Sequence, residues 1–209
     1  MSVVNRLKSL TARATMSDED VRSLLEKDHE EAKDLLRQIL DASQAQRRMR
    51  LFKQLKTALT AHSRAEERAV YNRMLKAKSP DSHELADEGY VEHGIIDGLL
   101  AQLSSGEAGN TRWLATAKAL KEVLEHHIAE EQTDTFAELG EHFDDDQLNE
   151  MGVAFLHAKA GVVVRTSRPH VRKMSRNAAS RSRSPRRAPT KKSTRAAKKS
   201  SRSRSRSAS

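Results

Sequence analysis

Four histidines recur along the chain at nearly equal intervals. They are separated by 33, 31 and 34 residues, and the second and fourth each have a glutamate four positions further on. The six residues are His29, His62, Glu66, His93, His127 and Glu131. Positions i and i+4 of an α-helix lie on one face about 6 Å apart, so each His-x3-Glu pair can chelate one cation. Imidazole and carboxylate donors suit iron, manganese or zinc.

The two halves of the chain repeat this pattern with a period of 64 to 65 residues. The first half has His-x3-Glu-x4-Tyr from position 62, and the second has His-x3-Glu-x4-Phe from position 127. In each half an earlier histidine, at 29 or 93, is followed six residues later by a leucine pair. Any one of these histidines could be a hydrogen-bonded core residue. Two buried glutamates without a cation would each cost several kcal/mol, so the duplicated set predicts a dinuclear metal site in a four-helix bundle.

The elements that must position these ligands are predicted by apolar stripes at helical spacing. Each stripe includes the ligand candidates at places where a core residue is expected. Ser79-Pro80 ends the second stripe, because proline removes a hydrogen-bond donor and disfavours helix at the residue before it. The first predicted helix begins at Ser17, and the second spans residues 45–78. The third runs from the Pro80–Ser82 turn to about residue 104, and the fourth begins near Thr111. A short fifth helix begins at Asp144–Asp146.

We therefore predict an all-α fold, an antiparallel up-down four-helix bundle with a short fifth helix and a disordered basic C-terminal tail. The expected organisation is an N-terminal lead-in at 1–16, the bundle at 17–160 and the tail at 161–209. Residues 1–16 are basic, free of acids and apolar at helical spacing, which is also typical of a short mitochondrial transit peptide. A frayed lead-in to the first helix is the interpretation that we favour.

Composition excludes several kinds of site. The sequence contains no cysteine, which excludes disulfides, iron–sulfur clusters and thiolate ligands. It contains no run of 18 apolar residues, so we expect no membrane span and no membrane partner. We expect a cytoplasmic protein.

Charge is distributed unevenly along the chain. Residues 161–209 contain 17 Lys and Arg and no acid, whereas residues 1–160 contain the other 21 together with all 29 Asp and Glu, so the two regions carry about +17 and about −8. The Ser- and Arg-rich tail predicts disorder and non-specific binding to nucleic-acid phosphates. Base stacking is unavailable, since no aromatic residue follows Phe155. The alternatives are a solubilising tail and a tail that contacts the acidic body.

Four stretches resemble the hemerythrin-like, or HHE cation-binding, domains. They are Lys27-Asp28-His29-Glu30, residues 62–67 followed by Tyr71, residues 92–97, and residues 126–131 followed by Phe136. The resemblance covers about residues 17–160 and implies a four-helix bundle holding two non-haem iron ions, with manganese or zinc as alternatives. By position it implies that the four histidines are terminal ligands and that Glu66 and Glu131 bridge the two ions.

The chain departs from the oxygen-carrying hemerythrins on the third and fourth helices. Those proteins have what looks like a His-x3-His pattern on the third helix and a His-x4-Asp pattern on the fourth. This chain has His93-x3-Asp97 and His127-x3-Glu131 at these places. We include Asp97 in the metal site, as a ligand or as the holder of a bound water, with a polar residue near the bundle end as the alternative. Four histidines and two bridging glutamates fill about eight of roughly twelve positions on two irons, leaving about four for other ligands.

Several neighbours of the ligands are weaker candidates. Asp28 and Glu92 each precede a ligand histidine and fit either support of that histidine or simple exposure. Glu67, His126 and Glu130 point about 100° away from the ligand face, because each is one residue removed from a ligand. We expect these three at the surface or behind a ligand.

The expected function is that of a non-haem di-iron protein that binds or senses dioxygen, peroxide, nitric oxide or iron, tethered to nucleic acid by its basic tail. The alternative is a nucleic-acid-binding protein whose bundle is only a metal-stabilised scaffold. A third hypothesis, an oxidase or peroxidase with an organic substrate, lacks a pocket signature. The sequence contains no nucleophile–His–acid arrangement, phosphate loop or cofactor fingerprint, and no catalytic residue is assigned.

Overall fold

The structure, a computed structural model, describes residues 19–167 and the side chains up to residue 163. The predicted lead-in and the tail beyond Ser167 lie outside the described residues. Regular structure within the described part is helical throughout. The elements in chain order are α2 (Val21–Asp41), α3 (Ala45–Glu66), η1 (Glu67–Tyr71), α4 (Asn72–Met74), α5 (Pro80–Ser105), α6 (Thr111–Glu130), η2 (Glu131–Thr135), α7 (Phe136–His142) and α8 (Asp145–Ser167).

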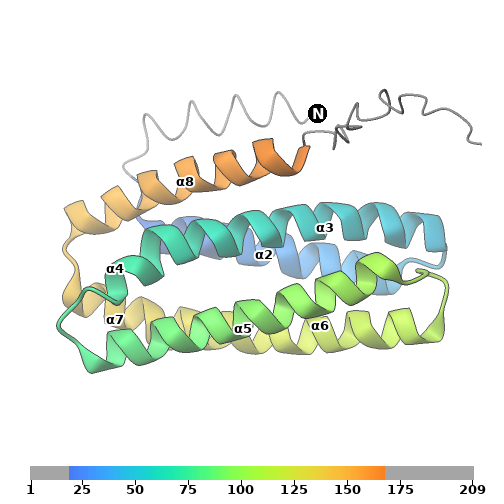
Figure 1. Cartoon of the computed structure of the whole chain (residues 1–209), viewed down its shortest axis with the longest axis horizontal. Coiled ribbons are helices and arrows are strands. Elements are labelled where there is room, and N and C mark those ends of the chain that lie inside the picture. Colours follow the sequence, from blue (N-terminus) through green and yellow to red (C-terminus); the bar gives the residue numbers. More distant parts are fainter. Residues whose placement is uncertain (1–18, 168–209) are drawn as a thin grey trace, which may run out of the picture. The chain divides into compact units, whose positions relative to one another are not determined.

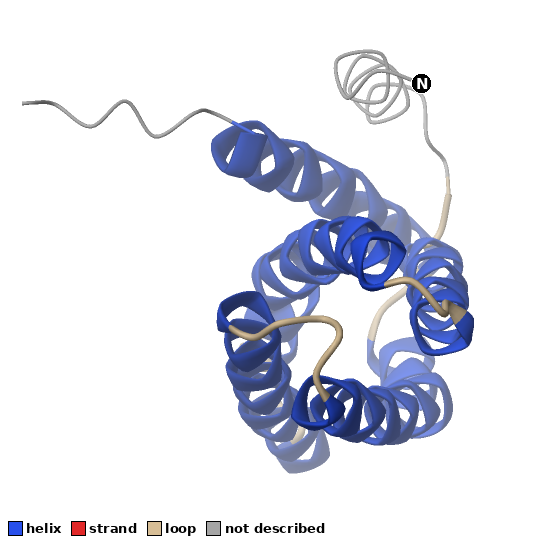
Figure 2. Cartoon of the chain, turned by 90° about the vertical axis from the view of Figure 1, so that its right-hand side faces the viewer, coloured by secondary structure: helices blue, strands red, loops and turns tan. Residues whose placement is uncertain are grey.

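Four helical columns form an antiparallel bundle, and a fifth helix packs on its outside (Figures 1 and 2). The columns are α2, then α3 with η1 and α4, then α5, and finally α6 with η2 and α7. Short connections between successive columns place them side by side. The all-α bundle with a fifth helix is as the sequence predicts. No helix among the described residues is long and apolar enough to cross a membrane.

The helix starts are fixed by side chains that cap free backbone amides. Asp20 caps α2, since its Oδ1 accepts from the Arg22 amide at 2.9 Å. Ser79 caps α5 ahead of Pro80 at the first helical position, where proline loses nothing because that amide has no partner in a helix. The cap of α6 is Asn110 rather than the predicted Thr111, because the Asn110 carboxamide accepts from the Arg112 amide at 2.8 Å.

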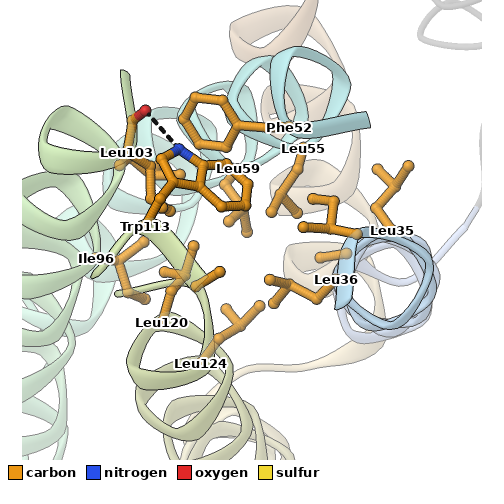
Figure 3. Packing of buried hydrophobic residues seen from close by; sticks show 14 of the residues in the cluster. Leu35, Leu36, Phe52, Leu55, Leu59, Ile96, Leu103, Trp113, Leu120 and Leu124 are labelled. Atoms are coloured by element: carbon orange, nitrogen blue, oxygen red, sulfur yellow. Dashed lines mark hydrogen bonds between the residues drawn. The ribbon is translucent and has the colours of Figure 1, made fainter. Parts of the chain in front are cut away.

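An apolar cluster fills the end of the bundle where α2 joins α3 and α5 joins α6 (Figure 3). Phe52 and Trp113 meet edge to face there, with ring centroids 5.9 Å apart. The Trp113 indole N–H donates to the Leu103 carbonyl at 3.0 Å, so the buried ring leaves no polar group unsatisfied.

A second apolar cluster fills the opposite end of the bundle, and the predicted ligands lie between the two clusters. On α2, His29 follows Leu25 of the second cluster and precedes Ala32 of the first. On α3, His62 follows Leu59 of the first cluster and precedes Ala65 of the second. The polar centre is therefore enclosed by apolar packing on both sides, which excludes water and strengthens electrostatic interactions there.

Each half of the bundle contains one π-helical turn that the sequence analysis did not predict. The turns η1 and η2 span Glu67–Tyr71 and Glu131–Thr135, so each begins at or directly after a predicted bridging glutamate. Apolar periodicity cannot resolve a single wide turn inside a long helix. Such turns are rare and are frequently found at functional sites.

Helix α8 is longer than the short fifth helix that the sequence predicts. It reaches Ser167, because Ala160 and Val162 continue its buried face beyond the expected boundary at 160. It packs against α3, α2 and η1. The start of α2 approaches α8 closely at Gly152, where a β-carbon would lie 2.3 Å from the Glu19 carbonyl oxygen.

Candidate metal centre

Six of the seven predicted metal-site side chains converge in the middle of the bundle. All six are at most 4% exposed, and they come from α2, α3, α5, α6 and η2. Their ligand atoms form two groups, each with all atoms within 4.8 Å of one another. The groups are His62, Glu66, His93 and His127, and His29, His62 and Glu131. The two groups share His62, so they adjoin one another, and a centre with two ions stays a prediction.

Each glutamate faces histidines from more than one helix. Glu66 Oε2 lies 3.3 Å from His62 Nε2 and 3.4 Å from His93 Nε2. Glu131 Oε2 lies 3.0 Å from His29 Nε2 and 3.6 Å from the Nε2 atom of His127. Each His-x3-Glu pair therefore meets one further histidine from a different column.

The donor atoms of this centre lack hydrogen-bond partners among the described residues. Both oxygens of Glu66 and of Glu131 are buried without one, as is the Nε2 atom of all four histidines. The short contacts between these groups do not have hydrogen-bond alignment. A buried polar atom left unpaired costs about 1–3 kcal/mol, and several in one chamber require a common partner. One or two divalent cations at their centre would satisfy all of them, so the residues present fit a metal.

The pKa values explain why the metal-free centre must hold protons. Burial and the neighbouring Glu66 raise the pKa of Glu131 well above its ordinary value. Burial also raises the pKa of Glu66, but contacts with Glu131, His62 and His93 outweigh it and leave that pKa well below its ordinary value. Two carboxyl groups in one buried space cannot both ionise without a counterion. A cation would replace the proton on Glu131.

The histidines are tuned in opposite directions. Burial, with the neighbouring His62, lowers the pKa of His29 to about 2, so this imidazole is neutral and can ligate. Burial lowers the pKa of His62 too, but contacts with Asp28 and Glu66 outweigh it and raise that pKa to about 9. Since a ligating imidazole must be deprotonated, metal binding at His62 competes with a proton.

Three carboxylates hold three of the histidines from behind through their Nδ1 atoms. The distances are 3.3 Å from Asp28 to His62, 3.2 Å from Glu67 to His93 and 2.6 Å from Glu92 to His127. A carboxylate on Nδ1 fixes the tautomer and turns Nε2 toward the centre. Asp28 and Glu92 therefore support predicted ligand histidines, which is one of the two roles that the sequence left open.

Each supporting carboxylate is itself paired with a cationic or titratable side chain. Asp28 binds Lys159 of α8, and Glu67 binds Arg64 of α3. Glu92 Oε1 lies 3.9 Å from the exposed imidazole of His126. The fifth helix is thereby linked to the centre through Lys159, Asp28 and His62.

Asp97 is the predicted site residue that the structure does not bring into the centre. Its Oδ2 accepts from Arg64, and its side chain is 36% exposed. Spacing of four residues places it on the same face of α5 as His93, but Arg64 from α3 holds it at the edge of the bundle. This ion pair turns Asp97 away from the six converging side chains, and a ligand role for Asp97 stays a prediction.

Two aromatic walls of the centre were not identified from the sequence. The Tyr71 ring stacks on the His93 imidazole at 5.5 Å and 28°. The Phe155 ring of α8 meets His62 edge-on at 5.9 Å. Tyr90, one turn before His93, instead contacts Tyr71 and donates to the Glu67 carbonyl at 3.3 Å. The signal for Tyr71 was its place in the repeated His-x3-Glu-x4-aromatic pattern.

A small cavity adjoins the centre on the side of α5 and α6. Its volume is about 10 Å³, which is the space of about one water molecule. Its walls include Tyr71, Gly89, His127, Glu131 and, farther out, Glu92 and Glu130. The cavity is therefore lined both by buried predicted ligands, His127 and Glu131, and by partly exposed acids.

Comparison with known proteins agrees with this geometry. Residues 20–139 match the hemerythrin HHE cation-binding domain. An all-α bundle with a buried His and Glu cluster is thus the fold of a metal-binding hemerythrin-like domain. This chain belongs to the hemerythrin HHE cation-binding domain family.

Two curated relatives extend the comparison. The chain is 26% identical over 133 residues to an uncharacterised hemerythrin-like protein of Schizosaccharomyces pombe, covering 64% of this chain and 66% of that protein. It is 22% identical over 155 residues to a protein of Nostoc named DNA nickase, covering 74% of this chain and 43% of that protein. The chain thus covers less than two thirds of the length of either relative. No solved structure matches it significantly.

Proposed function

We propose that the bundle is a non-haem di-iron centre that binds or senses dioxygen, peroxide, nitric oxide or iron itself. The observation that carries this proposal is that eight buried donor atoms have no hydrogen-bond partner among the described residues and belong to six side chains that converge in the bundle. They are four imidazole nitrogens and four carboxylate oxygens. Two irons held there would supply one-electron redox chemistry and positions for small ligands. The four histidines together with Glu66 and Glu131 would hold the two ions.

Donor chemistry and cavity size favour this assignment over an enzyme with an organic substrate. Nitrogen and oxygen ligands without thiolate suit iron, with manganese and zinc as the alternatives to be tested. A cavity that holds about one water molecule fits a diatomic gas or peroxide. A cavity of this size is small for an organic substrate.

Elemental analysis of protein purified from its native host tests the metal directly. We expect about two irons per chain and an optical spectrum that changes on exposure to air. Glu66→Ala should remove the metal, whereas Glu141→Ala, at an exposed position on α7, should keep it. Fewer than about one metal ion per chain in the wild type would contradict the proposal.

We further propose that the basic tail, residues 161–209, tethers the bundle to nucleic acid. Its charge of about +17 with no acid supports backbone-directed binding. The name of the Nostoc relative, a DNA nickase, also supports a connection with DNA. The competing function is a nucleic-acid-binding protein in which the bundle serves only as a scaffold.

One pair of variants separates these two functions. Truncation after Ser167 retains all of α8 and removes most of the tail charge. If the bundle is only a scaffold, truncation abolishes every activity and Glu66→Ala changes none. If the centre is the functional part, Glu66→Ala abolishes the response to oxidants or gases while nucleic-acid binding persists.

A further inference from the structure

We propose that Glu92, His126 and Glu130 form a third cation site, which captures a divalent iron ion at the surface for delivery to the buried centre. This inference rests on the proposed di-iron function. The three side chains lie on α5 and α6 beside the mouth of the cavity described above.

The geometry is that of a chelate open to solvent. His126 Nε2 lies 3.2 Å from Glu130 Oε1 and 3.9 Å from Glu92 Oε1, and one donor atom from each residue lies within 4.8 Å of the others. The His126 side chain is 64% exposed and that of Glu130 is 38% exposed. One imidazole and two carboxylates suit a divalent first-row metal ion that keeps several of its waters.

The outer pair on α6, His126 and Glu130, has the same His-x3-Glu pattern as the buried pair His127 and Glu131, shifted by one residue toward the N-terminus. His126 and Glu130 have the same spacing as His127 and Glu131, but a step of one residue turns them about 100° around the helix. The four residues therefore present one chelate inward and one outward on adjacent faces of a single helix.

Glu92 connects the outer chelate to the inner one. Its Oε2 accepts from the Nδ1 atom of His127 at 2.6 Å, while its Oε1 faces His126. One carboxylate thus contacts a predicted ligand of the buried centre with one oxygen and the surface imidazole with the other. A cation on the outer side would lie next to the residue that orients His127.

The cavity supplies the route between the two sites. Its lining includes the partly exposed Glu92 and Glu130 as well as the buried His127 and Glu131. Both oxygens of Glu131 are buried and unpartnered, so a cation that displaces the proton of this carboxyl group can bind there. Glu88 lines the cavity as well, and a mouth with several acids concentrates cations and raises their rate of association.

The first half of the bundle has no counterpart of this site. The positions equivalent to His126 and Glu130 are Ala61 and Ala65, and both are fully buried. Ala65 belongs to the same apolar cluster as Phe155 of α8. The two halves of the repeat therefore differ at these positions. The first half has buried alanines on α3, against which α8 packs, and the second half has the outer chelate on α5 and α6, on the other side of the bundle from α8 (Figure 2).

A second polar cluster on the bundle provides a matched comparison. Glu138, Glu141 and His142 also place their donor atoms within 4.8 Å of one another. Glu138 Oε1 is already occupied, because it accepts from the hydroxyls of Ser79 and Ser82 at 2.6 and 2.5 Å. That cluster does not line the cavity, so it should not affect iron uptake.

The test uses the double variant His126→Asn/Glu130→Gln in the full chain and retains Glu92, because Glu92 also holds His127. Ferrous iron is mixed anaerobically with metal-free protein, and uptake is followed in a stopped-flow instrument. We expect uptake to slow roughly tenfold while the final content stays at about two irons per chain. A titration with cobalt(II) should show a third, weaker equivalent in the wild type that the variant lacks.

The control is Glu141→Gln/His142→Asn, which makes the same change of charge at the other cluster and should load at the wild-type rate. Unchanged uptake in the His126 variant overturns the capture role, and so does equal slowing in the control. Loss of the third cobalt equivalent without slower uptake also overturns it. If the wild type itself takes up no iron at the buried ligands, the proposed di-iron function fails, and delivery to it fails as well.

Discussion

At the scale of single residues, Glu131 separates the metal-free and metal-bound forms most clearly. Its pKa is raised well above the ordinary value by burial and by the charge of Glu66, so without a cation its carboxyl group is best accommodated neutral. A cation reverses this preference, because it pairs with the ionised form. The same residue is therefore a tolerated neutral group in one state and a required anion in the other.

Glu131→Gln should consequently affect the two forms differently. The amide has the shape of the neutral acid, so the free energy of unfolding of the metal-free variant should lie within about 1 kcal/mol of the wild-type value. Ferrous iron at about 100 times its Kd should stabilise the wild type by roughly 2.7 kcal/mol and the variant by much less. Thermal unfolding with and without iron measures both effects. Equal stabilisation of the two proteins by iron would refute a ligand role for Glu131.

Gly89 allows Tyr71 to lie against α5. A β-carbon at this position would lie 2.5 Å from the Tyr71 ring and its hydroxyl, closer than atoms can pack. Gly89→Ala should displace the ring that stacks on His93 and destabilise the protein by about 1–3 kcal/mol. Gly98→Ala, on the same helix with no atom within 4 Å, should instead stabilise it by up to about 1 kcal/mol. Urea unfolding of both variants checks the opposite signs.

At the scale of elements, Glu138 joins the last column of the bundle to the start of α5. Its carboxylate accepts from Ser79, which caps α5, and from Ser82 in the first turn of that helix. Burial raises the pKa of Glu138, but the two serine hydroxyls outweigh it and leave that pKa below its ordinary value of 4.5. A lowered folded-state pKa stabilises the fold above the unfolded value, and this stability is lost as pH falls through the folded value.

Glu138→Gln should therefore remove a pH-dependent contribution. At pH 7 we expect a loss of about 1–2 kcal/mol, since hydrogen bonds to a charged acceptor are replaced by bonds to a neutral one. As the pH falls below about 4.5, the difference in unfolding free energy between variant and wild type should shrink, because the wild-type carboxylate becomes protonated and neutral like the amide. Glu141→Gln, at an exposed position on the same helix, serves as the control. A constant difference between pH 3 and pH 7 would show that the carboxylate charge is not what joins the two elements.

The sequence was sufficient to predict the helical columns and the convergence of six side chains, because both follow from spacing along a regular helix. Contacts between columns were not predictable in this way. Asp97 has the right spacing from His93, yet Arg64 on another column determines where its carboxylate lies. The π turns after Glu66 and at Glu131 were missed for a related reason, since a change in helix pitch leaves no trace in apolar periodicity.

At the scale of the whole molecule, the two halves of the repeat have diverged toward different surroundings. The first half is covered by α8, whose Phe155 packs on His62 and whose Lys159 binds Asp28. Among the described residues no helix covers the second half in this way, and His126, Glu130 and the small cavity lie there. The bundle thus has one side that α8 covers and another side that carries the outer His and Glu cluster and the cavity.

The basic tail adds a property that the bundle lacks, and its contribution can be measured through salt dependence. If about ten Lys and Arg side chains contact phosphates of duplex DNA, the logarithm of the association constant should fall with the logarithm of salt concentration at a slope of about −9. Truncation after Ser167 should bring that slope close to zero, since the acidic body carries a charge of about −8 and repels DNA. Fluorescence anisotropy between about 50 and 200 mM salt measures the slope. The value should be the same for unrelated sequences, because contacts to the backbone do not read bases. Tight binding by the truncated protein would place the interface on the bundle and contradict the tether.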